Sequence, residues 1–162
     1  MSQNMSLCWN DDTWSFVRVQ VLTNASANLQ HCLWDIQIGF NTPPTGEPTI
    51  LAAFLPFGGR VRNNSLSVAS SSGLHQLMTS LSLEVFVLSD AGSANSHTFT
   101  FAPSPNPTLI VTADPATLMV TTTTTVEKAT PFSIWTVLDP SVLSTTLQCM
   151  SSKSAALWTT CV

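Results

Sequence analysis

The stretch from Cys32 to Arg60 constrains the fold more than any other part of the chain. Its first half contains WDIQIGF, in which apolar side chains stand at every second position, with polar residues or glycine between them. This period of two is typical of a strand with one buried face. A proline-rich loop, NTPPTGEP, follows, and a second apolar run then extends from Ile50 to Phe57. Because proline removes a backbone donor and fixes φ, this loop should neither continue the strand nor easily begin a helix. We therefore predict a long β-hairpin, or two consecutive strands joined by a loop at a sheet edge.

The alternation in this stretch also identifies the side chains that should face inward. The core residues predicted from it are Trp34, Ile36, Ile38, Phe40, Ile50 and Phe54. The connecting loop carries no group suited to catalysis apart from Glu47. We therefore expect the stretch to organise a scaffold, with function on the scaffold's outer surfaces.

Short apolar or β-branched runs separated by turn residues recur along the rest of the chain. Such runs predict strands, and we expect them over residues 16–22, 98–102, 109–113, 117–126, 132–138, 143–150 and 155–162. Residues 63–73 are expected to form a loop or a short edge strand. Residues 74–88 fit helical spacing at their start and strict alternation at their end. We predict a helical turn over 72–78 and a strand over 80–88.

These elements give an all-β fold of about nine or ten short strands with little helix. Turn signals recur roughly every 8–15 residues, and no strand–helix–strand alternation is present. This pattern is typical of an antiparallel β-sandwich or a jelly-roll-like barrel. With 162 residues, the chain is expected to form a single β-sandwich domain over residues 1–162.

Charged residues are scarce in this chain. They make up 9% of the sequence, against roughly 25% in typical soluble domains, and the formal net charge is −4. Nucleic-acid binding needs a basic face that neutralises phosphates. The only close cationic pair, Arg60 and Arg62, flanks a Gly-Gly turn and is expected to be a solvated loop. We therefore expect no direct nucleic-acid binding, and a neutral surface suited to being covered by neighbouring proteins.

No membrane span or secretion signal is expected. No apolar run approaches the roughly 18 residues of a membrane-spanning helix. The first residues, MSQNMSLCWNDD, lack the cationic start and apolar centre of a signal peptide. This reading applies to the sequence as it stands, because a precursor from which the chain is cut would carry its own signals.

The four cysteines lie near the two ends of the chain, at Cys8, Cys32, Cys149 and Cys161. None belongs to a C-x-x-C pair, and three disulfide pairings are open if all four are oxidised. Since reduced cysteine behaves as a small hydrophobic residue, we expect buried free thiols.

The sequence predicts no catalytic, cofactor or metal site, and hence no enzyme. Ser96-His97 with Asp90 or Asp114 would supply the groups of a hydrolase, but no G-x-S-x-G elbow is present. The spacing of His31 with the cysteines matches no zinc motif. Glycine-rich phosphate loops are absent.

Tryptophans near polar side chains form a candidate contact for a glycan or a protein partner. Aromatic rings provide faces on which a sugar can stack, and amides and carboxylates bind its hydroxyls. The residues chosen on this basis are Trp9, Asn10, Asp11 and Trp158. Tryptophans also serve as core or interface anchors, and that alternative stays open.

The stretch from Cys32 to Arg60 also shows a resemblance to a known protein family. The segments WDIQIGF and TILAAFLPFGG, separated by a proline-containing loop, resemble the opening of jelly-roll and related β-sandwich domains in icosahedral virus capsid proteins. The charge-poor, Ser/Thr/Pro-rich composition is similar as well. The resemblance implies a virus structural protein without enzymatic activity.

This chain departs from many shell proteins in lacking a basic arm for the genome. The resemblance therefore implies a small capsid subunit, a protruding domain or a protein that decorates the shell. Its implied partners are other capsid subunits or copies of itself, with a host receptor or glycan on the outside. Its implied location is the virion, after synthesis in the host cytoplasm. A carbohydrate-binding or adhesin-like β-sandwich is the alternative.

Overall fold

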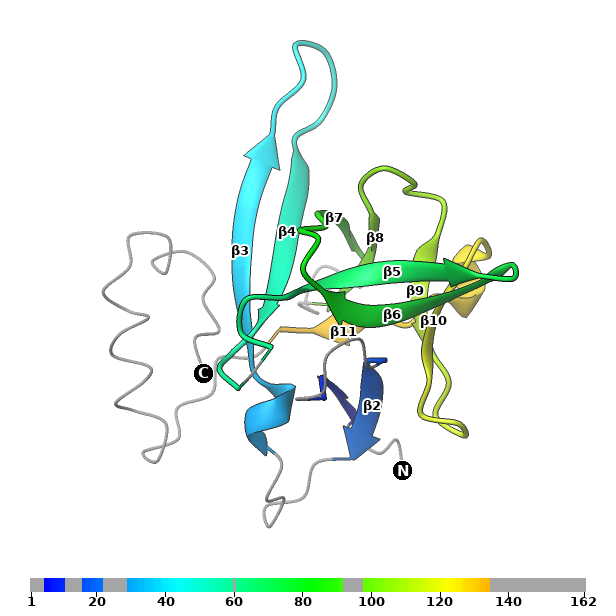
Figure 1. Cartoon of the computed structure of the whole chain (residues 1–162). Coiled ribbons are helices and arrows are strands. Elements are labelled where there is room, and N and C mark those ends of the chain that lie inside the picture. The colour runs from blue at the N-terminus through cyan, green and yellow to red at the C-terminus, as the bar shows by residue number, and fades with distance from the viewer. Residues whose placement is uncertain (1–4, 11–15, 22–28, 60, 92–97, 135–162) are drawn as a thin grey trace.

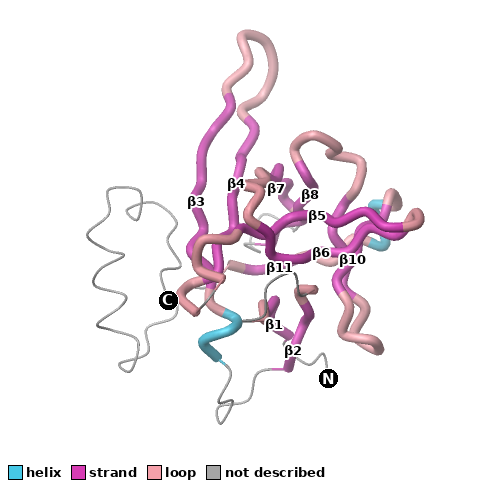
Figure 2. The backbone as a smooth tube through the Cα atoms, viewed as in Figure 1, coloured by secondary structure: helices cyan, strands magenta, loops and turns pink. Residues whose placement is uncertain are grey.

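The structure is a computed structural model that describes residues 5–10, 16–21, 29–59, 61–91 and 98–134 of the chain. These residues form mostly antiparallel β-sheet, with short 3-10 helices (Figure 1; Figure 2). The strands are β1 (Met5–Cys8), β2 (Arg18–Val21), β3 (Trp34–Asn41), β4 (Thr49–Pro56), β5 (Ser65–Ser71), β6 (Leu74–Ser80), β7 (Phe86–Asp90), β8 (Thr98–Pro103), β9 (Ile110–Ala113), β10 (Val120–Thr123) and β11 (Phe132–Ser133). The 3-10 helices are η1 (Leu29–Cys32) and η2 (Val126–Lys128). The prediction of an all-β sandwich is confirmed.

The strands are arranged in three sheets. A five-stranded sheet has the order β11-β8-β7-β4-β3, a four-stranded sheet has the order β5-β6-β10-β9, and β1 pairs with β2. One buried cluster draws on all three sheets, through residues such as Phe86, Leu77 and Val19. The chain thus buries the apolar faces of its sheets against one another, as a sandwich does.

The predicted hairpin over Cys32–Arg60 is present as β3 and β4. The two strands pair antiparallel from Trp34 opposite Pro56 to Asn41 opposite Thr49. They project beyond the neighbouring sheet, with the proline-rich loop at the tip (Figure 1). β3 is the last strand of its sheet, so the expected position at a sheet edge is also confirmed.

The core predicted from this hairpin is correct at its base and wrong at its tip. Trp34, Ile36 and Phe54 are buried, and Ile38 and Ile50 are partly buried against the core. The prediction for Phe40 is wrong, because 58% of this residue is exposed. Phe40 lies near the end of an edge strand, where the hairpin projects past the rest of the sandwich (Figure 1).

Aromatic rings fill the centre of the five-stranded sheet's inner face. Phe54, Phe86 and Phe101 come from three neighbouring strands, and their ring centroids lie 5.1–5.7 Å apart. Phe132 extends the cluster, with its ring centroid 5.1 Å from that of Phe101. Such edge-to-face and tilted pairs add to the stabilisation from burial alone. The cluster fixes the position of the β3–β4 hairpin relative to β7 and β8.

The helical turn predicted over 72–78 is wrong. Residues Leu74–Ser80 form β6, which pairs with β5 through a two-residue turn with Ser71 opposite Leu74. Ser72 and Gly73 both have positive φ, of 50° and 81°. Positive φ at both central positions defines the type I′ turn that suits the twist of a hairpin. Ser-Gly was the local signal for this turn, and pairing of β6 with β10 completes the strand.

The remaining strand predictions agree with the structure where they can be compared. β2, β8, β9, β10 and β11 lie within or close to the predicted ranges, although β10 is shorter and β1 was not predicted. The strand predicted over 80–88 begins only at Phe86. The strands predicted over 143–150 and 155–162 lie outside the described residues.

Candidate functional site

A polar hollow of about 460 Å³ lies between the small β1–β2 sheet and η1. Its lining residues are Cys8, Trp9, Asn10, Phe16, Arg18, Gln20 and His31. It contains two of the residues predicted as a glycan or partner contact, Trp9 and Asn10. The other two, Asp11 and Trp158, lie outside the described residues.

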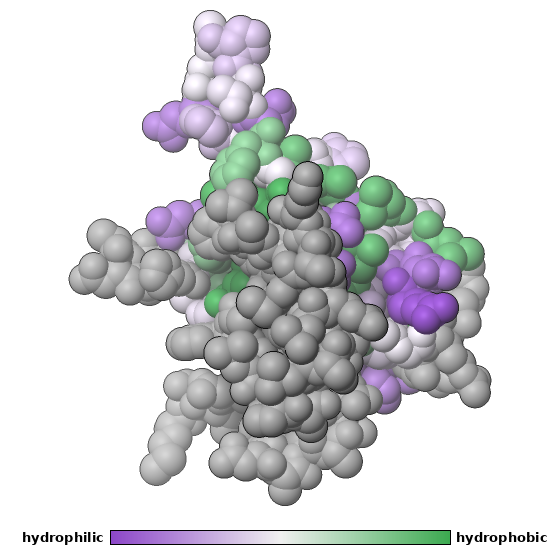
Figure 3. All heavy atoms as spheres, turned by 90° about the vertical axis from the view of Figure 1, so that its left-hand side faces the viewer, coloured by the Kyte–Doolittle hydropathy of each residue, from purple (hydrophilic) through white to green (hydrophobic). Residues whose placement is uncertain are grey.

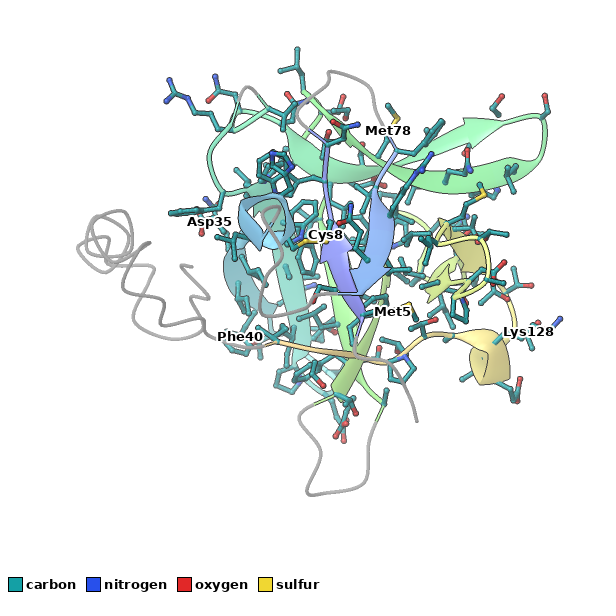
Figure 4. All side chains as sticks on the ribbon, turned by 90° about the horizontal axis from the view of Figure 1, so that it is seen from below. Met5, Cys8, Asp35, Phe40, Met78 and Lys128 are labelled. Atoms are coloured by element: carbon teal, nitrogen blue, oxygen red, sulfur yellow. A yellow bond between two sulfur atoms is a disulfide. The ribbon has the colours of Figure 1, made fainter. Side chains whose placement is uncertain are left out.

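Cys8, which lines the hollow, forms a disulfide with Cys32 (Figure 4). The prediction of free thiols is therefore wrong for these two cysteines. The bond joins β1 to η1 across a sequence separation of 24, so it restricts the unfolded chain as well as fixing the folded one. Spacing alone did not reveal the pairing, because it requires knowing that residues 5–8 form a strand beside η1.

Trp9 serves as a structural anchor beside the disulfide. Its indole Nε1 donates a hydrogen bond to the Leu33 carbonyl at 2.8 Å, and its backbone N–H donates to the His31 carbonyl at 2.7 Å. Its ring lies 4.8 Å from the His31 ring, and 3% of the residue is exposed. Trp9 is thus held in place at the hollow by these contacts, and its buried indole leaves no free face for stacking. Contact with a glycan or a partner stays a prediction.

Phe16 and Arg18 supply the accessible chemistry of the hollow. Phe16 is 47% exposed, and Arg18 is exposed on the face of β2 opposite the buried Val17 and Val19. Gln20, two residues further along the same face, adds an amide. An aromatic ring, a guanidinium and amides can bind a planar polar or anionic group. Sequence reasoning did not select Phe16, Arg18, Gln20 or His31 as site residues, although the first three lie in the strand predicted over residues 16–22.

The catalytic candidates from the sequence are described by the structure only in part. Ser96 and His97 lie outside the described residues. Asp114 is occupied in the β9–β10 turn, where Thr117 Oγ1 and the Ala116 N–H donate to its carboxylate at 2.8 and 2.9 Å. These hydrogen bonds lower the pKa of Asp114. Within the described part of the chain, no group of three His, Cys, Asp or Glu side chains could hold a metal ion.

Several large apolar side chains are exposed on the described part of the chain. The larger ones in the described residues are Phe16, Phe40, Leu74, Leu81, Leu83, Leu118, Met119 and Val126. Leu81 and Leu83, in the β6–β7 loop, are 70% and 67% exposed. Figure 3 shows apolar side chains gathered below the polar tip of the hairpin on the β3 side of the molecule. There, Phe40 lies on the same strand as Ile38, which lines a shallow apolar depression with Ile50, Leu88, Phe99 and Ile134.

No family model, curated protein or solved structure matches this chain. Among the described residues, none of the helices is long and apolar enough to cross a membrane. Function is therefore inferred from the fold and the surface of the chain itself.

Proposed function

We propose that this protein is a virus structural protein, a capsid subunit or outer protrusion, that acts through protein–protein contacts in particle assembly. The observation that carries the proposal is the exposure of large apolar side chains on the surface of the described chain. Phe40, Leu81 and Leu83 are each more than half exposed. Large aromatic and aliphatic side chains of this kind anchor protein interfaces when a partner covers them.

The low charge of the chain supports the same function. With 9% charged residues, neighbouring copies meet little charge that must be desolvated, and burying an unpaired charge is costly. Neutral Ser and Thr hydroxyls can exchange hydrogen bonds with water for hydrogen bonds with a neighbour at little cost. A surface of this composition is suited to close packing in a shell.

The Cys8–Cys32 disulfide supports a location outside the reducing cytosol. Disulfides form and persist on virion and cell surfaces and in other oxidising surroundings. This favours the outer face of a particle, where host attachment takes place, even if the chain is made in the host cytoplasm. The capsid assignment itself is supported by the resemblance of residues 34–40 and 49–59 to capsid β-sandwich domains, and these two segments contain the paired strands β3 and β4.

The experiment is to measure the mass and particle state of the purified chain over a range of concentrations. Light scattering and electron microscopy should show a defined oligomer or incorporation into particles. Replacing Leu81 and Leu83 together by serine should weaken the assembly without unfolding the chain, because both side chains are exposed. A chain that stays monomeric at every concentration and never joins a particle would refute the proposal.

A carbohydrate-binding module is the second candidate, favoured by the hollow beside the disulfide. Phe16 and Arg18 provide a ring and a cation that could bind an acidic or planar group of a sugar. Binding detected on a glycan array should be lost in both Phe16→Ala and Arg18→Gln, while Val126→Ser, an exposed residue of η2, should retain it. If no glycan gives a signal, this candidate is excluded.

A further inference from the structure

Four backbone N–H and four C=O groups of β3 point away from β4, along the outer edge of the sheet. Phe57 N–H donates to the Leu33 carbonyl at 3.0 Å, so Leu33 and Phe57 are a hydrogen-bonded pair of the β3–β4 ladder. Such pairs alternate along an antiparallel ladder. The odd-numbered residues of β3 therefore direct their N–H and C=O groups toward β4. The even-numbered residues direct theirs outward: Trp34, Ile36, Ile38 and Phe40.

The position of Pro56 agrees with this assignment. Pro56 lies opposite Trp34 in the register, which makes the two a non-hydrogen-bonded pair. A proline has no N–H, so it can face Trp34 at this place without loss of a ladder bond. The outward direction of the Trp34, Ile36, Ile38 and Phe40 backbone groups thus follows from two independent features of the hairpin.

The other outer edges of the two larger sheets are short, or have outward backbone groups that are hydrogen-bonded within the chain. Val68 N–H of β5 donates to a Glu84 carboxylate oxygen at 2.6 Å. At β9, the Ala113 N–H donates to Thr130 Oγ1 at 2.8 Å, and Thr130 N–H donates to the Val111 carbonyl. β11 has only two residues. Among the described residues, no strand or side chain pairs with the outer edge of β3.

β3 also lacks the features that protect edge strands from pairing. It has eight residues and contains no proline, lysine or arginine, which are the common guards of an edge. Asp35 is its single charged residue, and its side chain projects from a face of the sheet. Figure 4 shows Asp35 and Phe40 at the margin of the described ribbon. An open edge of this length is a template for a further strand.

We propose that a second copy of this chain pairs with the β3 edge, strand antiparallel to strand, about a two-fold axis at Gln37. In this register, every outward N–H and C=O group of one copy meets a partner on the other, because the outward residues pair as Trp34 with Phe40 and Ile36 with Ile38. A shift in register leaves some of these groups unpaired. The two five-stranded sheets then continue as one sheet across the dimer.

The side chains of β3 are self-complementary in this register. On one face, Trp34 lies opposite Phe40, so the ring that is exposed in the single chain gains an aromatic neighbour. On the other face, Gln37 lies opposite its own copy and Asp35 lies opposite Gly39. No like charges meet, and the residue facing the single carboxylate has no side chain. The partner that fits this edge best is therefore the same strand.

This inference rests on the proposed assembly function, for which it names one contact, and cysteine cross-linking tests it. Gln37 is exposed and its non-hydrogen-bonded partner would be Gln37 of the other copy, with Cα atoms about 4.5 Å apart, which a disulfide can span. Gln37→Cys in the otherwise native chain should therefore yield covalent dimers under mild oxidation. Mass spectrometry should place the new bond between two copies of position 37.

Two cysteine variants serve as controls. Ser71→Cys is exposed at the end of β5, and Gly39→Cys lies on β3 but opposite Asp35 rather than itself. Both should form at least tenfold less symmetric dimer than Gln37→Cys. Equal cross-linking in the three variants would overturn the inference. So would a bond from position 37 to Cys149 or Cys161 of the same chain, because it would mean that the chain's own C-terminal part occupies the edge.

A charge variant separates this inference from the proposed function. Gln37→Lys brings two like charges together on the axis, and should weaken the dimer at least tenfold in sedimentation analysis while circular dichroism shows that the chain stays folded. Oligomers that withstand Gln37→Lys, with no bond at position 37 in Gln37→Cys, would overturn the β3 contact alone. A chain that is monomeric under all conditions would overturn the assembly function as well.

Discussion

β3 and β5 are both edge strands formed by hairpins, yet the backbone groups along their outer edges have different surroundings. Along β5, the β6–β7 loop lies close to the strand, with Ser65 Oγ donating to the Ser82 carbonyl at 2.7 Å. Glu84 from the same loop accepts the outward N–H of Val68. Along β3, no such loop or carboxylate is found in the described residues. As far as the structure describes the chain, a neighbouring carboxylate thus caps an outward amide of β5, and none caps the outer edge of β3.

The difference indicates that, among the described residues, only particular sheet edges are left open to pairing with another strand. In the described ranges, a charged side chain accepts an outward amide that could otherwise pair with a strand at β5, and none does so at β3. Both hairpins contribute to one core, through Leu66 and Leu77 on one side and Ile36 and Phe54 on the other. Stability is therefore shared between the hairpins, and the edges differ in what can bind to them.

The largest expected effect tests which way the β3 backbone groups point. Gln37→Pro removes an N–H that is directed at β4, and should lower the free energy of unfolding by roughly 3 kcal/mol or more. Ile38→Pro removes an outward N–H and part of a half-buried side chain. It should cost about 1–2 kcal/mol, while abolishing the proposed dimer. Urea unfolding followed by tryptophan fluorescence measures both.

If Gln37→Pro and Ile38→Pro destabilise the chain equally, the assignment of inward and outward groups is wrong. Their proximity provides a close control, since the two substitutions are adjacent in one strand and introduce the same ring. Circular dichroism at 25 °C should confirm that Ile38→Pro stays folded.

How far the sequence predicts this fold depends on whether the signal is local. Alternation over Trp34–Phe40 predicted β3, because a strand with one buried face is visible within a few residues. The same alternation failed at Phe40, since burial there depends on where the sheet ends. Leu74–Met78 fits a helical spacing as well, and only pairing with β5 and β10 decides for strand. Register and sheet order are long-range properties that a local pattern does not contain.

The candidate site was predicted only in part, for similar reasons. Trp9 and Asn10 were selected as aromatic and polar residues close in sequence, and they do line one hollow. The burial of Trp9 was not visible, because its partners His31 and Leu33 are more than 20 residues away. The Cys8–Cys32 bond has the same character. The open edge of β3 needed both the hairpin register and the sheet order.

The second prediction would make the two edges alike. Glu84→Ala leaves the Val68 N–H without its charged acceptor, which should lower the free energy of unfolding by about 1.5–3 kcal/mol. It should also open β5 as a second pairing edge, so the chain should self-associate more strongly. Light scattering at matched concentrations measures the association. Glu47→Ala, which removes an exposed carboxylate from the hairpin loop, is the control. Association no greater than in Glu47→Ala would show that Glu84 does not protect the edge.

The third prediction extends the comparison from the edges to the turns. The β5–β6 turn places Gly73 at a φ of 81°, whereas the β9–β10 turn forces Leu118 to a φ of 61°. A non-glycine residue in this region carries a cost, and asparagine tolerates it better than leucine. Leu118→Asn should therefore raise the free energy of unfolding by up to about 1 kcal/mol, because the strain exceeds what the partly exposed Leu118 side chain contributes.

Gly73→Ala is the reverse experiment at the other turn. A Cβ at Gly73 would meet no atom within 4 Å, so the backbone conformation alone should destabilise this variant, by about 1 kcal/mol. Opposite signs for Leu118→Asn and Gly73→Ala in thermal unfolding are the expected outcome. Destabilisation by both variants would mean that the packing of Leu118 outweighs its strain.

The smallest expected effect concerns the carboxylates at the two edge strands, Glu84 beside β5 and Asp35 on β3. Glu84 is satisfied by a backbone amide, whereas partial burial raises the pKa of Asp35 above 3.8, and a hydrogen bond from Gln37 opposes this rise. A raised pKa means that the folded chain binds the proton more tightly than the unfolded chain. The resulting stabilisation is present below pH 3.8 and is lost as the pH rises through the folded pKa.

Asp35→Asn should therefore flatten the pH dependence of stability just above this value. At neutral pH it should stabilise the chain by a fraction of a kcal/mol, because solvent screens a half-exposed group. Urea midpoints measured at several pH values, with Glu47→Gln as the control, test this. A slope unchanged by Asp35→Asn would mean that the exposed face of β3 carries no electrostatic cost, and that only its backbone edge distinguishes it from β5.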